Sequence, residues 1–170
     1  MLADRASELA ARRPPRRVFI LASGPTLSIA RYGAAKLLEY AVDAGAQCLE
    51  EFHHLEMFIG DQDSWLVPVL PDAASADRFA EVRGVHADLG MHTLECSADG
   101  DLAVLPALAR PQAQVLAAQA LQWLAYGVAR GLGRQVNQWV GGVRRDAIYR
   151  MSNRTVRSSS VEPTDYRRTV

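Results

Sequence analysis

Short apolar runs alternate along the chain with longer segments in which apolar residues recur every three or four positions. The apolar runs are residues 18–22 and 65–70, and residues 92–97, after a stop at Gly90, form a third predicted strand. The longer segments are residues 26–44, 75–89 and 111–132. Continuous apolar runs of this length are typical of strands covered on both faces, and the longer spacing is typical of amphipathic helices. The order predicts an α/β fold with a mainly parallel sheet between two layers of helices, joined by right-handed crossovers.

The end of the first predicted strand is the expected ligand site, because ligands of such sheets bind beyond the carboxyl ends of the strands. The strand is followed by the turn ASGPT, in which Ser23, Gly24 and Thr26 precede a helix. This turn has neither a Walker loop nor the G-x-G-x-x-G fingerprint of a nucleotide site. Its amides and hydroxyls suit a phosphate or a sugar hydroxyl, unless Ser23 or Thr26 only caps the helix.

The helix after this turn has a core side and a side that carries charged groups. The polar side holds Tyr32, Lys36, Glu39 and Asp43. Lys36 is the single lysine among nineteen basic residues, and a lysine, unlike an arginine, readily shifts its pKa or attacks a carbonyl. Lys36 and Glu39, three residues apart, are therefore either a functional pair or an ordinary surface ion pair of little energetic weight.

A cluster of acidic residues and histidines, EEFHHLEMF, occupies residues 50–58. His53 and His54 are adjacent and cannot both face one metal ion on a regular element, so the cluster does not favour a metal site. Glu50, Glu51 and Glu56 could supply a general base or carboxylates that bind a ligand. The sequence predicts no metal and no cofactor.

Composition describes a protein of about one domain in 170 residues, with 49% hydrophobic and 22% charged residues. The formal net charge is zero, so no overall field favours nucleic acid or anionic lipid. Cys48 and Cys96 are isolated, as in a reduced, cytoplasmic protein. There is no apolar signal segment and no stretch of about 18 apolar residues, so we expect no membrane association and a cytoplasmic location.

The domain organisation follows from where these patterns stop. We expect residues 1–16 to form an N-terminal arm or linker ended by two prolines, residues 17–157 to form a single domain, and residues 158–170 to form a flexible tail. Residues 102–108 are expected to add a short edge segment. Aromatic residues outside the main apolar face of the longest helix suggest contact with a partner chain. The candidates for this contact are Trp123, Tyr126 and Trp139.

Several of these segments together resemble the second sugar isomerase (SIS) domain of glucosamine-6-phosphate synthase-like phosphosugar isomerases and deaminases. The matching segments are GAAKLLE at residues 33–39, EFHH at 51–54, SWLVPVLP at 64–71, QALQWLAYGVARGLG at 119–133 and MSNRTVRSS at 151–159. The resemblance covers residues 18–159. It implies a three-layer αβα sandwich of the SIS type, related to flavodoxin-like and Rossmann-like folds, with roughly five strands in the sheet.

The resemblance also implies roles for individual residues. Glu39 occupies the position of the base that moves a proton between C1 and C2 of an open-chain sugar, and Lys36 would assist it at the sugar oxygens. His54 occupies the position of the ring-opening histidine, which is often delivered to a neighbouring subunit. Glu51 and Arg154, with the turn after the first strand, would contact the sugar phosphate or aminosugar phosphate.

The chain also departs from the family pattern. Leu55 and Glu56 stand in place of Gly-Pro, Arg154 stands where some members have a lysine that forms a Schiff base, and residues 70–77 carry acids instead of a Ser-rich phosphate loop. Two hypotheses follow. The chain is half of an aldose–ketose isomerase or aminosugar-phosphate deaminase whose phosphate loop lies on another chain, or it is a non-catalytic module for sugar-phosphate binding, regulation or assembly. Both imply a homo-oligomer, such as a dimer, or a companion SIS-domain chain.

Overall fold

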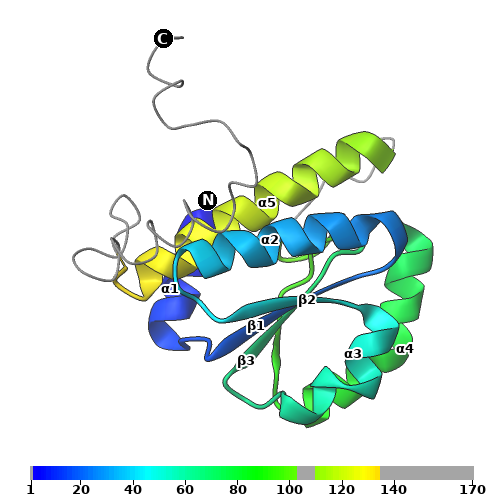
Figure 1. Ribbon diagram of the computed structural model, residues 1–170, viewed down its shortest axis with the longest axis horizontal. Helices are drawn as coiled ribbons and strands as arrows, with labels where there is room; N and C mark the ends of the chain where they lie inside the picture. Colours follow the sequence, from blue (N-terminus) through cyan, green and yellow to red (C-terminus); the bar gives the residue numbers. More distant parts are fainter. Residues whose placement is uncertain (1, 103–109, 135–170) are drawn as a thin grey trace, which may run out of the picture. The chain divides into compact units, whose positions relative to one another are not determined.

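Four parallel strands, in the order β2-β1-β3-β4, form the sheet in the part of the chain that the computed structural model describes, residues 2–102 and 110–134 (Figure 1). The elements in chain order are α1 (Leu2–Arg12), β1 (Arg17–Ala22), the 3-10 turn η1 (Gly24–Thr26), α2 (Leu27–Glu39), β2 (Ala44–Cys48), α3 (Leu49–His54), the 3-10 turn η2 (Glu56–Ile59), β3 (Ser64–Pro68), α4 (Ala73–Asp88), β4 (His92–Thr93) and α5 (Arg110–Gly131). The predicted edge segment beyond Leu102 lies outside the described residues, so four strands are described where roughly five were expected.

Helices cover both faces of the sheet, because successive side chains of each strand point to opposite sides. Val18, Ile20 and Ala22 of β1 belong to a core cluster with α1, α2 and α5. Phe19 and Leu21 belong to a second cluster with α3 and α4. The predicted three-layer α/β architecture with a parallel sheet is therefore confirmed (Figure 1).

Helix α2 ends earlier than the sequence pattern predicted, and the reason lies in its last turn. Ala41 adopts a left-handed conformation with φ of 58°, and its N–H donates to the Leu38 carbonyl at 2.8 Å. The N–H of Val42 donates to the Leu37 carbonyl at 3.0 Å, which completes a Schellman ending. Asp43, expected on the polar side of the helix, lies beyond it.

Strand β2 was not predicted, because its sequence AGAQC contains no apolar run. It lies at the edge of the sheet, pairs only with β1 among the described strands, and all five of its residues are half-buried. Small residues suffice at such an edge, since the strand is held by its backbone pairing more than by side-chain burial.

Helix α1 packs closely against α5, although its segment was expected to be an arm or linker. Ala3, Ala6 and Ala10 of α1 are buried. At Gly127 and Gly131 of α5, an added Cβ would overlap the α1 backbone. Small residues on both helices therefore let the two backbones approach, and α1 contributes to the core. The domain boundaries expected at residues 16/17 and 157/158 stay a prediction.

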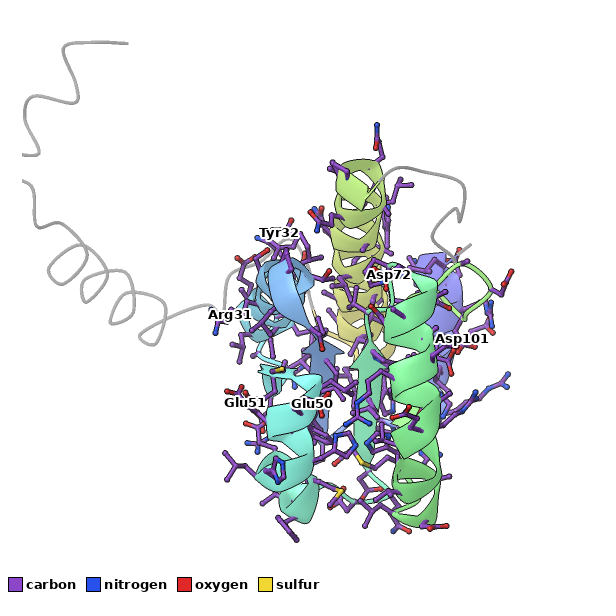
Figure 2. The ribbon with its side chains drawn as sticks, turned by 90° about the vertical axis from the view of Figure 1, so that its right-hand side faces the viewer. Arg31, Tyr32, Glu50, Glu51, Asp72 and Asp101 are labelled. Carbon is purple, nitrogen blue, oxygen red and sulfur yellow. The ribbon has the colours of Figure 1, made fainter. Side chains whose placement is uncertain are left out.

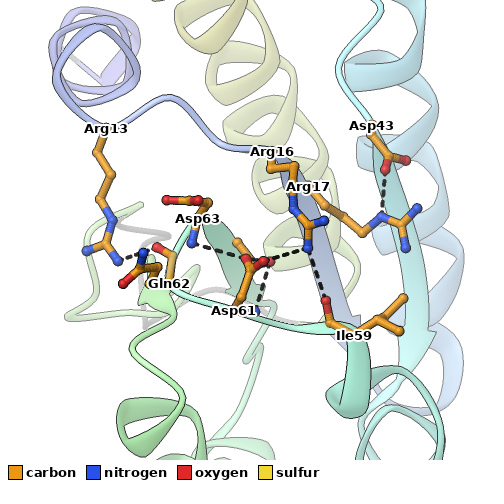
Figure 3. A network of polar contacts seen from close by, with 9 residues as sticks. Arg13, Arg16, Arg17, Asp43, Ile59, Asp61, Gln62 and Asp63 are labelled. Atoms are coloured by element: carbon orange, nitrogen blue, oxygen red, sulfur yellow. Dashed lines mark hydrogen bonds and ion pairs between the residues drawn. The ribbon is translucent and has the colours of Figure 1, made fainter.

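The amino ends of the strands are tied together by arginines and aspartates (Figure 3). Arg16 donates to Asp61 at 2.6 Å, and Arg17 donates to Asp43 at 2.6 Å. Asp61 also accepts a hydrogen bond from the Ser64 hydroxyl at 2.8 Å. Both arginines and both aspartates are partly exposed, so each ion pair stabilises the fold by no more than about 1 kcal/mol. These contacts organise the end of the sheet opposite to the one where ligands of such folds bind.

Candidate functional site

A cleft of about 390 Å³ lies at the carboxyl ends of β1 and β3, where the topology of a parallel sheet predicts a ligand site. Figure 2 views the domain from this side, with Glu50 on α3 and Asp72 at the start of α4. The apolar walls of the cleft come from the strand ends and the segments after them. They are formed by Leu21, Ala22, Leu49, Pro68, Val69, Leu70, Pro71 and Ala74.

The turn predicted to bind a ligand lines this cleft with all three of its candidate residues, Ser23, Gly24 and Thr26. Gly24 has φ of +57°, and an added Cβ would meet open space, so backbone conformation and not crowding favours glycine. Neither Ser23 nor Thr26 makes a side-chain cap bond, so the alternative that these hydroxyls only cap the helix is wrong. Thr26 is only 4% exposed.

Arg78 of α4 is the cation among the described residues that line the cleft, and carboxylates already surround it. Its Nε and Nη2 donate to the two carboxylate oxygens of Glu50 at 2.9 and 2.7 Å, and its Nη1 donates to Glu81. These bonds raise the pKa of Arg78, and Arg78 in turn lowers the pKa of Glu50. All three guanidinium nitrogens are therefore engaged within the protein.

The start of α4 supplies the remaining polar side of the cleft. The Asp72 carboxylate accepts hydrogen bonds from the backbone N–H of Ser75 at 2.9 Å and from its hydroxyl at 2.7 Å, which caps α4. Gln114 of α5 reaches the same cleft. Sequence reasoning noted the acids of this turn but did not place Arg78 or Gln114 at the site. The D-x-x-S pattern at residues 72–75 signals a helix start, whereas no local pattern identifies the other two.

Lys36 and Glu39 form a close pair on an accessible side of α2. The Lys36 Nζ donates to both Glu39 carboxylate oxygens, at 2.8 and 2.9 Å, and lies 5.4 Å from the centre of the Tyr32 ring. The side chains are 27% and 56% exposed, respectively. The hydrogen bond to Glu39 raises the pKa of Lys36, so the amine stays protonated. An ammonium group can stabilise a developing negative charge, but it cannot attack a carbonyl as an imine-forming lysine does.

The structure does not bring this pair to the cleft. Thr26 precedes α2 and Glu39 ends it, and thirteen helical residues at about 1.5 Å each separate the two by about 20 Å. His54 and Glu51 are exposed residues of α3, which covers the other face of the sheet, and neither lines the cleft. Arg154 and Trp139 lie outside the described residues.

The histidines of the acidic cluster point to different surroundings. His54 is exposed, whereas His53 is half-buried. The Nδ1–H of His53 donates a 2.6 Å hydrogen bond to the Leu49 carbonyl, and its ring centre lies 4.9 Å from that of the buried His86. No group of three or more potential metal ligands assembles within residues 2–102 and 110–134.

None of the helices in this part of the chain is both long enough and apolar enough to span a membrane.

Comparison with solved structures identifies the fold. The chain superposes on the C-terminal domain of a glucosamine-fructose-6-phosphate aminotransferase from Francisella tularensis with 25% sequence identity and a TM-score of 0.62, over 80% of this chain and 41% of that one. A glucosamine-6-phosphate deaminase from Thermotoga maritima matches with 14% identity and a TM-score of 0.65, over 79% of this chain and 41% of that one. The chain has the sugar isomerase (SIS) fold. The resemblance predicted from the sequence is thereby confirmed.

A smaller protein of similar fold matches a similar share of this chain. A protein described as a sugar-phosphate isomerase from Listeria monocytogenes matches with 9% identity and a TM-score of 0.52, over 78% of this chain and 74% of that one. No protein-family model matches the sequence, and no curated protein is significantly similar to it. The chain spans less than half the length of the Francisella and Thermotoga structures.

Proposed function

We propose that this SIS domain contributes Lys36 and Glu39 to proton transfer on a sugar phosphate or aminosugar phosphate, in an aldose–ketose isomerisation or a deamination. The observation that carries the proposal is the pair itself. An ammonium group is held by both oxygens of a carboxylate on an accessible side of α2. The fold is shared with a domain of a glucosamine-fructose-6-phosphate aminotransferase and with a glucosamine-6-phosphate deaminase.

The chemistry of the pair suits this reaction. Moving a proton between C1 and C2 of an open-chain sugar requires a carboxylate base and a cation beside the oxygens of the enediolate. Glu39 would act as the base, and Lys36, kept protonated by Glu39, would stabilise the negative charge. Ring opening needs a further acid–base group, which we assign to His54. Because α2 and α3 cover opposite faces of the sheet, His54 would act in the pocket of another chain.

The proposed site requires a second domain. The chain spans 41% of the two relatives that superpose on it best in the comparison above, and residues 70–77 carry acids where a phosphate loop would need hydroxyls. A companion SIS-domain chain would supply the phosphate loop. Glu51 and Arg154 lie in segments whose sequence resembles the family, and both would contact the sugar.

A second candidate function is binding without catalysis. One observation favours it: the cleft with Ser23, Gly24 and Thr26 lies about 20 Å from Glu39, so one chain cannot hold a sugar in the cleft and act on it with the pair. In that case the Lys36–Glu39 contact is a surface ion pair that contributes little to stability.

Exchange of sugar protons with solvent distinguishes the two functions without requiring knowledge of the reaction direction. The full chain, alone and with any protein that co-purifies with it, is incubated in D₂O with fructose 6-phosphate or glucosamine 6-phosphate. Deuterium at C1 or C2 is then followed by NMR. Catalysis predicts incorporation that falls at least about a hundredfold in Glu39→Gln and Lys36→Met, as expected for loss of a general base or its partner cation.

Glu81→Gln is the matched control, because Glu81 forms the same type of pair with Arg78, three residues away on another helix. It should leave exchange unchanged. Exchange rates in Glu39→Gln and Lys36→Met within about threefold of the unmodified chain would refute the catalytic proposal. Binding of a sugar phosphate without any exchange would establish the second candidate function instead.

A further inference from the structure

We propose that the β2 edge of the sheet is the docking surface for a second copy of this chain, paired antiparallel so that the two sheets join into one. The inference concerns assembly and does not depend on the proposed proton transfer. It also differs from the expectation drawn from the sequence, which named aromatic residues such as Trp123 of α5 as partner contacts. Three features carry it: the outward backbone groups of β2, the spacing of the helices, and the side chains beside the edge.

Strand β2 has a backbone edge without a neighbouring strand in the part of the chain that the structure describes, since it pairs with β1 alone. The N–H of Val18 in β1 donates to the Asp43 carbonyl at 2.9 Å, so every second residue counted from Asp43 turns its backbone groups toward β1. The residues between them turn theirs outward, namely Ala44, Ala46 and Cys48. The strand sequence, AGAQC, contains neither the charge nor the proline that usually blocks pairing at such an edge.

The outward residues are spaced symmetrically about Ala46, so a second β2 strand can pair with all of them. With a twofold axis at Ala46, Ala44 of one copy lies opposite the partner's Cys48, and Ala46 lies opposite its own counterpart. Each outward N–H then meets an outward carbonyl of the other strand. The same strand serves both copies, as a twofold interface requires, and this self-complementarity favours a second copy over an unrelated strand.

The helices beside β2 are placed so that they can pack across the same twofold axis. Helix α2 packs on both β1 and β2, and α3 does so on the opposite face of the sheet. Neighbouring strands lie about 4.8 Å apart, so the two α2 axes would be two strand spacings, about 10 Å, from each other. Packed helices lie about 8–10 Å apart. Gly33, midway along α2, lies over Ile20, the partner of Ala46 in the sheet, so the midpoints of the two helices would meet.

Exposed leucines flank the β2 edge in both helix layers. Figure 2 shows Arg31 of α2 and Glu51 of α3 on the same side of the domain, facing away from α5 and α4. Leu38, two turns after Arg31 on the same side of α2, is 54% exposed. Leu55, whose N–H donates to the Glu51 carbonyl at 3.0 Å, is 69% exposed. The twofold contact would bury each leucine in both copies, with the charged groups at its rim.

Disulfide cross-linking of the full chain tests the register of the two strands. Ala44→Cys places a thiol opposite the partner's Cys48, at a Cα separation of about 5.5 Å that a disulfide spans. The two positions are four residues apart in one extended strand, about 13 Å, so they cannot join within one chain. We expect a covalent dimer after mild oxidation. Gly45→Cys is the matched control, because its Cβ projects into open space on the other face of the sheet, and it should give none.

Light scattering during size-exclusion chromatography tests the surface itself. The unmodified full chain should be a dimer, and Ala46→Pro and Leu38→Glu should each raise its Kd at least about a hundredfold. Proline at position 46 removes an outward N–H and leaves the bonds between β2 and β1 in place. Leu38→Glu alters an exposed side chain and leaves the strand unchanged. Trp123→Glu makes the same kind of change at a residue of α5 that is 50% exposed, and it should leave the Kd unchanged.

Three results would overturn the inference. The first is a monomer at concentrations up to about 100 μM, where a specific interface of standard size should assemble. The second is a dimer that Trp123→Glu dissociates and Leu38→Glu does not. The third is cross-linking that is absent in Ala44→Cys or equally strong in Gly45→Cys. None of these measurements involves deuterium exchange at Glu39, so failure of this inference and failure of the proposed catalysis are distinguishable.

Discussion

Acidification should destabilise the domain through His86, a buried histidine of α4. Its side chain is fully buried, and neither ring nitrogen has a hydrogen-bond partner among the described residues. Phe79 stacks on it at 5.6 Å between ring centres, and Phe52 and His53 of α3 lie against it at 5.7 and 4.9 Å. Burial, with a smaller contribution from His53, lowers the pKa of His86 from 6.5 to about 4.

The sign of the effect follows from proton linkage. Because the pKa is lower in the folded state than in the unfolded state, the unfolded chain binds the proton more readily. The neutral histidine is therefore fully compatible with folding above pH 6.5, and stability is lost as the pH falls from 6.5 toward 4. At about 1.4 kcal/mol for each pH unit, the full loss is about 3 kcal/mol, of which about 2 kcal/mol falls between pH 7 and pH 5.

Urea unfolding at pH 7, 6 and 5 measures this loss directly, and His86→Leu provides the comparison. Leucine is close in volume, favours helix, and removes both buried ring nitrogens and the titration. The variant should be at least as stable as the unmodified chain at pH 7, and its stability should fall about 2 kcal/mol less between pH 7 and pH 5. His92, whose pKa burial also lowers, contributes equally to both proteins.

His54→Gln serves as the control, since His54 is an exposed histidine, and it should follow the unmodified chain at every pH. If His86→Leu lost as much stability between pH 7 and pH 5 as the unmodified chain, the assignment of the loss to His86 would be refuted.

Two further predictions concern backbone positions. Ala41→Gly should raise the free energy of unfolding, measured in urea, by about 0.5–1 kcal/mol, because glycine adopts the left-handed conformation without strain. An unchanged or lowered value would contradict the Schellman ending of α2. Gly127→Ala should lower the free energy of unfolding by about 1–3 kcal/mol, because the added methyl group overlaps the carbonyl oxygen of Ala3. Faster hydrogen exchange in α1 would show that the contact between α1 and α5 is the part that is weakened. An unchanged free energy of unfolding would contradict the close packing of the two helices.

The sequence predicted those elements whose side chains are buried on both faces. Strands β1 and β3 were recognisable because all or nearly all of their residues are buried. Strand β2 was missed because an edge strand of small residues has no such pattern. The end of α2 was missed for a different reason: the left-handed residue is Ala41, and sequence rules look for glycine or asparagine there.

The candidate site was predictable only where topology determines it. The rule for parallel sheets placed the turn with Ser23 and Thr26 at the ligand end, and that turn lines the cleft. Arg78 and Gln114 reach the same cleft from α4 and α5, far along the chain, and only the packing of the helices brings them there. The sequence also could not reveal that Glu50 and Glu81 engage the arginine, since Glu50 belongs to another helix.

Helix α2 determines how this SIS domain can act, because its two ends carry different chemistry. Its start adjoins the turn with Thr26, whose hydroxyl makes no cap bond to the helix, and its end carries Glu39 with the ammonium group of Lys36. A sugar ring held at one end cannot reach the other, about 20 Å away. If Glu39 transfers a proton as proposed, its substrate must therefore be positioned by another domain, and a ligand in the cleft would not reach the pair. Any binding at the cleft and any proton exchange at the pair should accordingly respond to separate substitutions, Thr26→Val affecting only the first and Glu39→Gln only the second.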